Sequence, residues 1–150
     1  DPMRISAKGR YALASVVHMA QQQHSGESIT LVSISERLGI SKIYLEQVFS
    51  LLKRADLVNS VKGAQGGYLL SSSPSQIRVL DVLTAVETGL FDKTEDTVPE
   101  KAPEIEFAMR ECAFEALDQA VAVALSQVSL EDLVFASEKH KGETAAMYYI

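Results

Sequence analysis

The segment 32–70 constrains the fold of this chain more than any other part of it. A short stretch with apolar residues at helical spacing stops at a glycine, and a serine then stands where the N-cap of a longer helix is expected. An alternating stretch and a glycine-rich turn follow, as in a β-hairpin. This order of elements predicts a winged helix-turn-helix, so the fold class is mainly α with a small β-wing. The predicted elements are a helix ending at Gly39, a helix from Ser41 to about Ala55, strands at 57–61 and 68–70, and a turn at 62–67.

Further helices surround this segment. One is predicted at about 7–23 and a fourth at 79–88, and a short β stretch at 29–31 precedes the first helix of the helix-turn-helix. That helix carries Ser33 and Glu36 at the spacing of a capping box. The inner face of the second helix is predicted to consist of Leu45, Val48, Phe49 and Leu52.

The C-terminal half predicts a second helical unit. Residues 104–127 form one long helix with apolar positions every three or four residues over about six turns. This is more apolar surface than the small winged domain can cover, so we expect the helix to pack against a second copy of the chain. Ser129 and Asp132 predict a capping box for a last short helix, 130–137. The predicted organisation is a winged domain at 3–88, a mobile, acidic linker at 89–103, dimerisation helices at 104–139 and a C-terminal tail at 140–150.

A net charge of −6 is unfavourable for DNA binding, but the charges are unevenly distributed along the chain. Residues 3–68 hold eight Lys or Arg and four Asp or Glu, whereas residues 69–150 hold six basic and fifteen acidic residues. The positive charge therefore lies on the predicted helix-turn-helix. This is the distribution expected when one half of a protein faces phosphate.

The second helix of the helix-turn-helix carries the sharpest candidate chemistry, because the start of this helix meets base edges in such folds. Gln47 can bond an adenine through two hydrogen bonds, and Glu46 can accept one from a cytosine amino group. Contacts to phosphate suit Ser41, Lys42 and Tyr44. The alternative is an ordinary solvated helix face, and the hairpin that follows weighs against it.

The predicted hairpin turn holds Gly63, Gly66 and Gly67 around Gln65. Glycine allows positive φ and lets the backbone approach a phosphate or a groove wall closely. Lys62, at the base of the turn, is placed to enter a minor groove or to touch phosphate. A phosphate-loop nucleotide site is excluded, because no Gly-Lys-Ser/Thr follows and both flanks are strands.

Other function classes find little support in the sequence. No nucleophile–base pair and no pair of carboxylates stands out, so we expect no enzyme activity. The single cysteine excludes an internal disulfide, and the three histidines show no metal-binding spacing. No secretory leader and no membrane span is recognised, which predicts a cytoplasmic protein without membrane contact.

Five motifs give the chain a resemblance to the Rrf2 family of bacterial winged-helix regulators. They are RISAKGRYAL at 4–13, YLEQ at 44–47, GAQGGYLL at 63–70, VLDVLTAVE at 79–87 and SLEDL at 129–133. The resemblance implies a homodimer on a palindromic operator in double-stranded DNA, with the long helix between the two copies. It also implies roles for individual residues: backbone contacts for Lys8, Arg10 and Tyr11, major-groove contacts for Ser41, Tyr44, Glu46 and Gln47, and a wing contact for Lys62. Members of the family often have Arg at this wing position, and Arg suits a minor groove better than Lys.

Iron–sulfur members of the family carry three cysteines in the loop before the long helix, and the corresponding segment 89–103 has none. Such clusters are usually held by four cysteines, and a dimer of this chain offers two. We therefore expect no cluster and no other cofactor. Cys112 lies on the apolar stripe of the long helix, where a small core or interface residue is the first interpretation and a redox sensor the second.

The motifs EDTVPE at 95–100 and AMYYI at 146–150 resemble the branch of the family that lacks a cluster and represses genes of cysteine metabolism. That resemblance implies a docking tail for a cysteine synthase, O-acetylserine thiol-lyase, made of Met147, Tyr148, Tyr149 and Ile150. The alternative is a hydrophobic tail folded on its own dimer.

The leading hypothesis is a sequence-specific repressor of cysteine or sulfur metabolism. A regulator of the same family that answers another redox or small-molecule signal is the first alternative. An adaptor protein that no longer binds DNA is the second, and the net negative charge favours it slightly.

Overall fold

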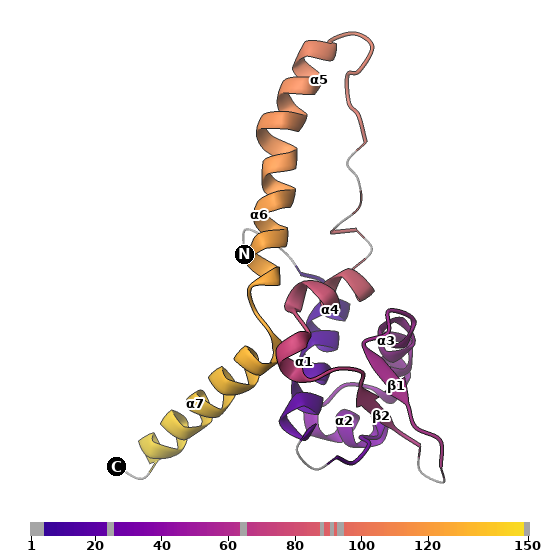
Figure 1. Cartoon of the computed structure of the whole chain (residues 1–150), viewed down its shortest axis with the longest axis vertical. Coiled ribbons are helices and arrows are strands. Elements are labelled where there is room, and N and C mark those ends of the chain that lie inside the picture. The colour runs from indigo at the N-terminus through magenta and orange to yellow at the C-terminus, as the bar shows by residue number, and fades with distance from the viewer. Residues whose placement is uncertain are drawn as a thin grey trace.

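The computed structural model describes residues 5–23, 26–63, 66–87, 89, 90, 92 and 95–148. They form a winged domain from which a long helical arm and a separate C-terminal helix project in different directions (Figure 1). The elements in chain order are α1 (Ala7–Gln21), α2 (Leu31–Leu38), α3 (Lys42–Arg54), β1 (Val58–Ser60), β2 (Tyr68–Leu70), the 3-10 turn η2 (Pro74–Gln76), α4 (Val79–Val86), α5 (Pro103–Met109), the π-helical turn η3 (Arg110–Phe114), α6 (Glu115–Ser126) and α7 (Leu130–Tyr148). The mainly helical, winged helix-turn-helix fold class is confirmed.

The core of the winged domain lies between α1, α3 and α4. The four residues predicted to face inward from α3 are all buried. Burial of each large apolar side chain stabilises the fold by roughly 1.5–3 kcal/mol. The ring of Phe49 packs on that of Tyr68 in β2 with centroids 4.9 Å apart, and this contact joins the helix to the wing.

Polar caps set the ends of the helices. Ser41 caps α3 as predicted, since its hydroxyl accepts the Tyr44 N–H at 3.2 Å. The Ser33–Glu36 capping box is wrong. Thr30 caps α2 instead, because its Oγ1 accepts the Ser33 N–H at 3.1 Å and Ser33 already lies within the first turn.

The capping box at the start of α7 is confirmed. Ser129 Oγ accepts the Asp132 N–H at 3.1 Å, and the Asp132 carboxylate accepts the Ser129 N–H at 2.9 Å. The hydrogen bond from the Ser129 N–H, with a further contribution from the Ser129 hydroxyl, holds the pKa of the Asp132 carboxyl below its usual value.

The wing is an antiparallel pair in which Val58, Asn59 and Ser60 face Leu70, Leu69 and Tyr68. The β stretch predicted at 29–31 shrinks to Ile29, which exchanges two backbone hydrogen bonds of 2.8 and 2.9 Å with Tyr68. It is shorter than expected because α2 already begins at Leu31.

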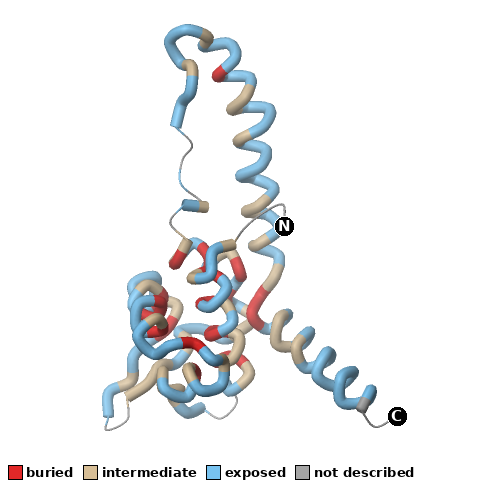
Figure 2. Tube along the Cα trace, turned by 180° about the vertical axis from the view of Figure 1, so that it is seen from behind, coloured by how far each residue is buried: buried red, intermediate tan, exposed pale blue. Residues whose placement is uncertain are grey.

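Helices α5 and α6 and the π-helical turn between them form one rod that stands out from the winged domain (Figure 1). Most of the arm is exposed in the single chain, as its pale blue colour shows (Figure 2). Glu106 is an exception: it is buried and accepts the N–H groups of Thr97 and Val98 at 2.8 and 3.0 Å. Arg110 pairs with both Asp96 and Glu106, so this end of the predicted mobile linker is tethered to the arm.

The last helix is much longer than predicted. α7 continues to Tyr148, so a last helix ending at Ser137 is wrong, and the residues predicted as a tail are helical from His140 to Tyr148. The extra residues are mostly Glu, Lys and Ala, which favour helix, and Gly142 costs the helix only about 1 kcal/mol relative to alanine. Leu130 anchors the start of α7 in the core. Among the described helices, none is both long and apolar enough to cross a bilayer.

Candidate nucleic-acid interface

The start of α3 presents a polar, solvent-facing surface. Ser41, Lys42, Glu46 and Gln47 are all exposed there. Lys42 Nζ lies 3.9 Å from Glu46 Oε1, and both side chains are about half exposed, so this pair is open to exchange with DNA groups. The structure therefore brings together four of the five residues predicted on this helix as a surface with both donors and acceptors.

Tyr44, the fifth residue, is directed differently. Its half-buried ring stands edge-on to the ring of Tyr11 in α1, with centroids 5.4 Å apart and an interplanar angle of 89°. Tyr44 also packs against the core, whereas Tyr11 remains 43% exposed. This aromatic pair fixes the position of α3 relative to α1.

The basic residues predicted on α1 do not share one face. Lys8 lies one helical turn from Tyr11 and thus on the side of α3. Arg10 instead lines a shallow groove with Leu133 of α7 and Arg37 of α2. Lys8 and Tyr11 therefore belong with the α3 surface, and Arg10 faces a neighbouring one.

The start of α1 is fixed by a residue that the sequence did not single out. The carboxylate of Glu87, just after α4, accepts the Ser6 N–H at 3.0 Å and also bonds the Ser6 hydroxyl. Ser6 in turn caps α1 by accepting the Gly9 N–H at 3.2 Å. A Cβ at position 9 would collide with the Glu87 carboxylate and would lie 2.9 Å from Ile5 Cγ2, so a larger residue fits here only if these side chains move. The signal in the sequence was a glycine inside a helical stretch.

The wing supplies a second part of the surface. Lys62 and Gly63 are exposed, and Gly66 and Gly67 have φ values of 64° and 128°. The side of Gly67 that would carry a side chain packs against the segment before α2. An added Cβ would lie 2.9 Å from Ser28 Oγ and 3.1 Å from the Ile29 carbonyl oxygen. Gln65 lies outside the described residues.

His18 adds no charge to this surface near neutral pH. Burial lowers the pKa of the imidazole, and the positive charge of Arg37 lowers it further, while a hydrogen bond with Gln21 opposes both effects. Its Nδ1 is buried and finds no hydrogen-bond partner among the described residues. The cations available to phosphate are therefore lysines and arginines.

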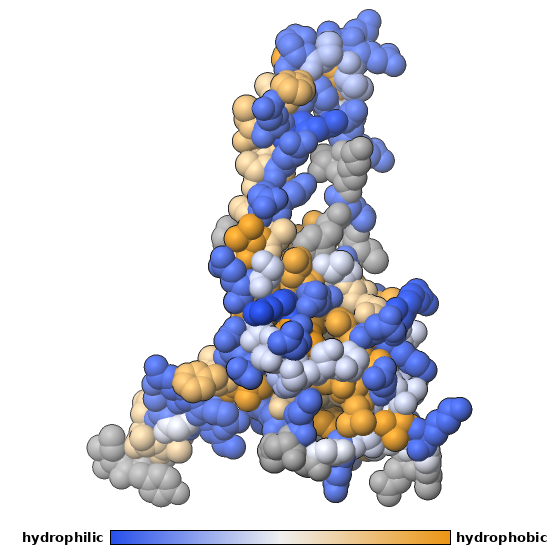
Figure 3. Space-filling model, in the orientation of Figure 1, coloured by the Kyte–Doolittle hydropathy of each residue, from blue (hydrophilic) through white to orange (hydrophobic). Residues whose placement is uncertain are grey.

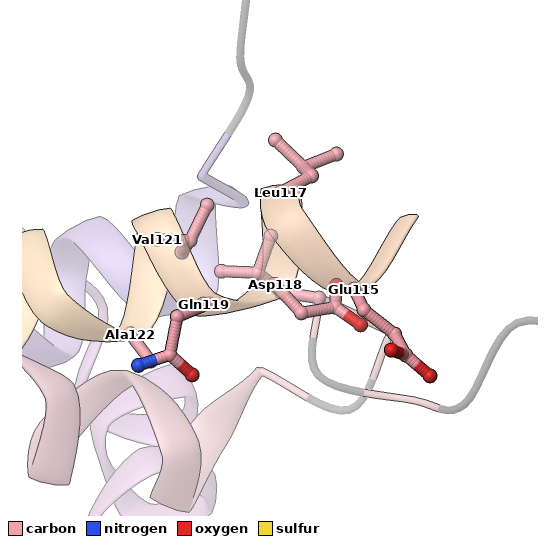
Figure 4. A pocket seen from close by; sticks show the side chains of 7 residues that line it. Glu115, Leu117, Asp118, Gln119, Val121 and Ala122 are labelled. Atoms are coloured by element: carbon pink, nitrogen blue, oxygen red, sulfur yellow. The ribbon is translucent and has the colours of Figure 1, made fainter. Parts of the chain in front are cut away.

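The arm has a different character from the winged domain. A hollow of about 560 Å³ on α6 is lined by Leu90, Glu115, Leu117, Asp118, Gln119, Val121 and Ala122. Leu117 and Val121 extend to the side opposite Glu115 and Gln119 (Figure 4). The carboxylates of Glu115 and Asp118 in this hollow repel phosphate, so this part of the arm is unsuited to DNA binding. Cys112, within the π-helical turn, is exposed in the single chain.

The predicted docking tail is only partly described. Met147, near the end of α7, is 76% exposed. Tyr148 is helical, and Tyr149 and Ile150 lie outside the described residues. Docking of a cysteine synthase at this end stays a prediction.

Comparisons with known proteins agree with this architecture. Residues 5–136 match the Rrf2 model, described as an iron-dependent transcriptional regulator. The transcriptional regulator IscR of Photorhabdus laumondii is 39% identical over 132 residues, which cover 88% of this chain and 79% of that protein.

Two solved structures extend the agreement to three dimensions. That of CymR, the global cysteine regulator of B. subtilis, is 34% identical with a TM-score of 0.71 and covers 89% of this chain and 98% of its own. That of T. potens IscR is 30% identical, also with a TM-score of 0.71, over 92% of this chain and 90% of its own. These relatives are regulators and not enzymes. With its helix-turn-helix, its wing and a family match over most of its length, this chain belongs to the Rrf2 family of DNA-binding transcriptional regulators.

Proposed function

We propose that this chain is a homodimeric repressor that binds a palindromic operator without an iron–sulfur cluster and controls genes of cysteine or sulfur metabolism. The observation that carries the proposal is the exposed polar surface at the start of α3, beside the wing and the start of α1. Contacts of α3 with base edges would select the sequence, while Lys8, Lys42 and Lys62 would hold phosphate.

Dimerisation is proposed from the arm. Within the described residues, α6 has no buried side chain, and Phe107 and Leu117 are 67% and 54% exposed. Orange and pale orange surface follows the arm in the space-filling view (Figure 3). A second copy aligned along the arm would cover this surface and would place two α3 helices on one operator.

The cluster-free state is proposed from the available ligands. The family description names iron, but this chain has one cysteine, and the described residues hold no group of three or more His, Cys, Asp or Glu side chains fit for a metal. The buried carboxylate of Glu106, in the arm, accepts two backbone N–H groups of the segment that precedes the arm. The donor set therefore does not fit a cluster with four cysteine ligands.

Cysteine metabolism is proposed from two similarities, one to the solved CymR structure and one in the motifs at 95–100 and 146–150. The similarity to proteins named IscR favours the alternative of a different signal. Genomic fragments enriched on the purified protein would decide between them. Promoters of sulfur-metabolism genes are expected, and enrichment of other promoters alone would support the alternative.

Affinity for an enriched fragment is expected to fall steeply with salt, because lysines that bind phosphate release counterions. The slope of log affinity against log salt should be about −5 if Lys8, Lys42 and Lys62 of both subunits bind phosphate, and about −7 if Arg10 joins them. A filter-binding titration measures this slope. A value near zero would leave the adaptor hypothesis as the better one.

Protein purified without oxygen is expected to show no visible iron–sulfur absorption. Cys112→Ser should keep the operator affinity of the unchanged protein, since no ligand is lost. One cluster per dimer that disappears in this variant would contradict the proposal.

A further inference from the structure

Ile43, in the first turn of α3, is the most exposed large apolar residue of the winged domain among those described. Its side chain is 72% exposed, whereas Leu45, Val48 and Phe49 of the same helix are fully buried. It belongs neither to the buried core nor to the partly buried hydrophobic residues packed against that core. The fold therefore gives this side chain no partner within the described residues.

The local structure does not require an isoleucine at this position. The apolar residue that precedes the N-cap of α3 is Ile40, which is buried together with Leu45, so the pair that packs across the start of the helix is complete without Ile43. A β-branched residue is also less favourable in an exposed helix than alanine or leucine. Neither capping nor helix propensity explains Ile43.

The neighbours of Ile43 show what it faces. Glu46 and Gln47 follow it by three and four residues, so all three side chains lie on one face of α3. Both neighbours are exposed, and the Lys42–Glu46 ion pair borders the same face. A DNA major groove that meets Glu46 and Gln47 must therefore also meet Ile43.

We propose that Ile43 contacts the C5-methyl group of a thymine in the major groove and thereby selects thymine at one position of each half-site. This inference rests on the proposed function. The isoleucine side chain has neither a donor nor an acceptor, and the thymine methyl is the only apolar group among those that distinguish the base pairs in that groove. The contact supplements the hydrogen bonds of Glu46 and Gln47, which cannot detect a methyl group.

Replacement of thymine by deoxyuridine tests the contact, because it removes only the methyl group. The duplex is an operator selected from a random library by the unchanged full-length protein, with each thymine replaced in turn, symmetrically in both half-sites. We expect one position at which the unchanged protein loses about fourfold in affinity per half-site. Ile43→Ser should bind the thymine operator more weakly and show no loss at that position, and Ile43→Val should retain most of the loss.

The remaining outcomes distinguish a failure of the Ile43 contact from a failure of the proposed function. If a specific operator is selected but no thymine is sensitive, or if the sensitivity persists in Ile43→Ser, the inference about Ile43 is overturned while the proposed function stands. If the selection yields no specific operator, the proposed function fails, and this inference fails with it. Thermal unfolding should be nearly equal for all three proteins, because position 43 is exposed; a large loss of stability in Ile43→Ser would show a structural role instead.

Discussion

A glutamate in place of Ala120 is expected to convert the protein to a monomer and to lower its affinity for the full operator by at least about 100-fold. Ala120 is exposed in the single chain and lies on the stripe of α6 that we propose to be covered by the second copy. An interface there would bury a carboxylate without a partner, which opposes association strongly. Loss of the dimer removes the second half-site contact, and linking two sites typically raises affinity by about 10²–10⁴.

Light scattering after size-exclusion chromatography would measure the mass of each protein. Filter binding to the palindromic operator would measure its affinity. Ala145→Glu provides a matched control, because Ala145 is also an exposed helical alanine but lies in α7, away from the arm. If the Ala120→Glu protein remains a dimer, the interface does not include Ala120 and lies elsewhere on the chain. A monomer that binds the palindrome as tightly as the unchanged protein would show that operator binding does not need the dimer.

Gly67→Ala is expected to lower the free energy of unfolding by about 2–5 kcal/mol and to weaken operator binding at least about tenfold. The φ of 128° is strained for any residue with a Cβ, and the new methyl group would meet the Ile29 carbonyl oxygen and Ser28 Oγ. The carbonyl belongs to the backbone that pairs with Tyr68, so relief requires a shift of the wing.

Gly26→Ala separates strain from crowding. Gly26 also has a positive φ, 70°, but an added Cβ there would meet nothing within 4 Å. This variant should lose only about 1–2 kcal/mol and bind the operator normally. Chemical denaturation measures the stabilities. Equal losses in the two variants would show that contact with Ile29 does not hold the wing.

Local signals predicted most of the winged domain correctly. The cap at Ser41, the stop at Gly39 and the glycine-rich turn each act over a few residues, so they can be recognised without knowledge of the fold. The four buried residues of α3 were predictable because apolar residues recur at helical spacing along this one helix.

The errors have physical causes of two kinds. The polar composition after Ser137 favoured a tail, although Glu, Lys and Ala sustain a helix well enough for α7 to reach Tyr148. Contacts between distant residues, such as Gly67 with Ile29, leave no local pattern that names the partner, and Gly9 within a helical stretch likewise does not identify Glu87. Ile43 is absent from the predicted contacts, and its exposure is known only from the structure.

The fit between Gly9 and Glu87 has a consequence for how sequences of this kind can change. Because the carboxylate occupies the space of a side chain at position 9, no larger residue can arise there while Glu87 keeps its present conformation. A shorter residue at 87 would open that space but would leave the Ser6 N–H without its acceptor. A change at either position therefore reaches the same hydrogen bond: a side chain at 9 displaces the carboxylate that accepts the Ser6 N–H, and a shorter residue at 87 removes that carboxylate.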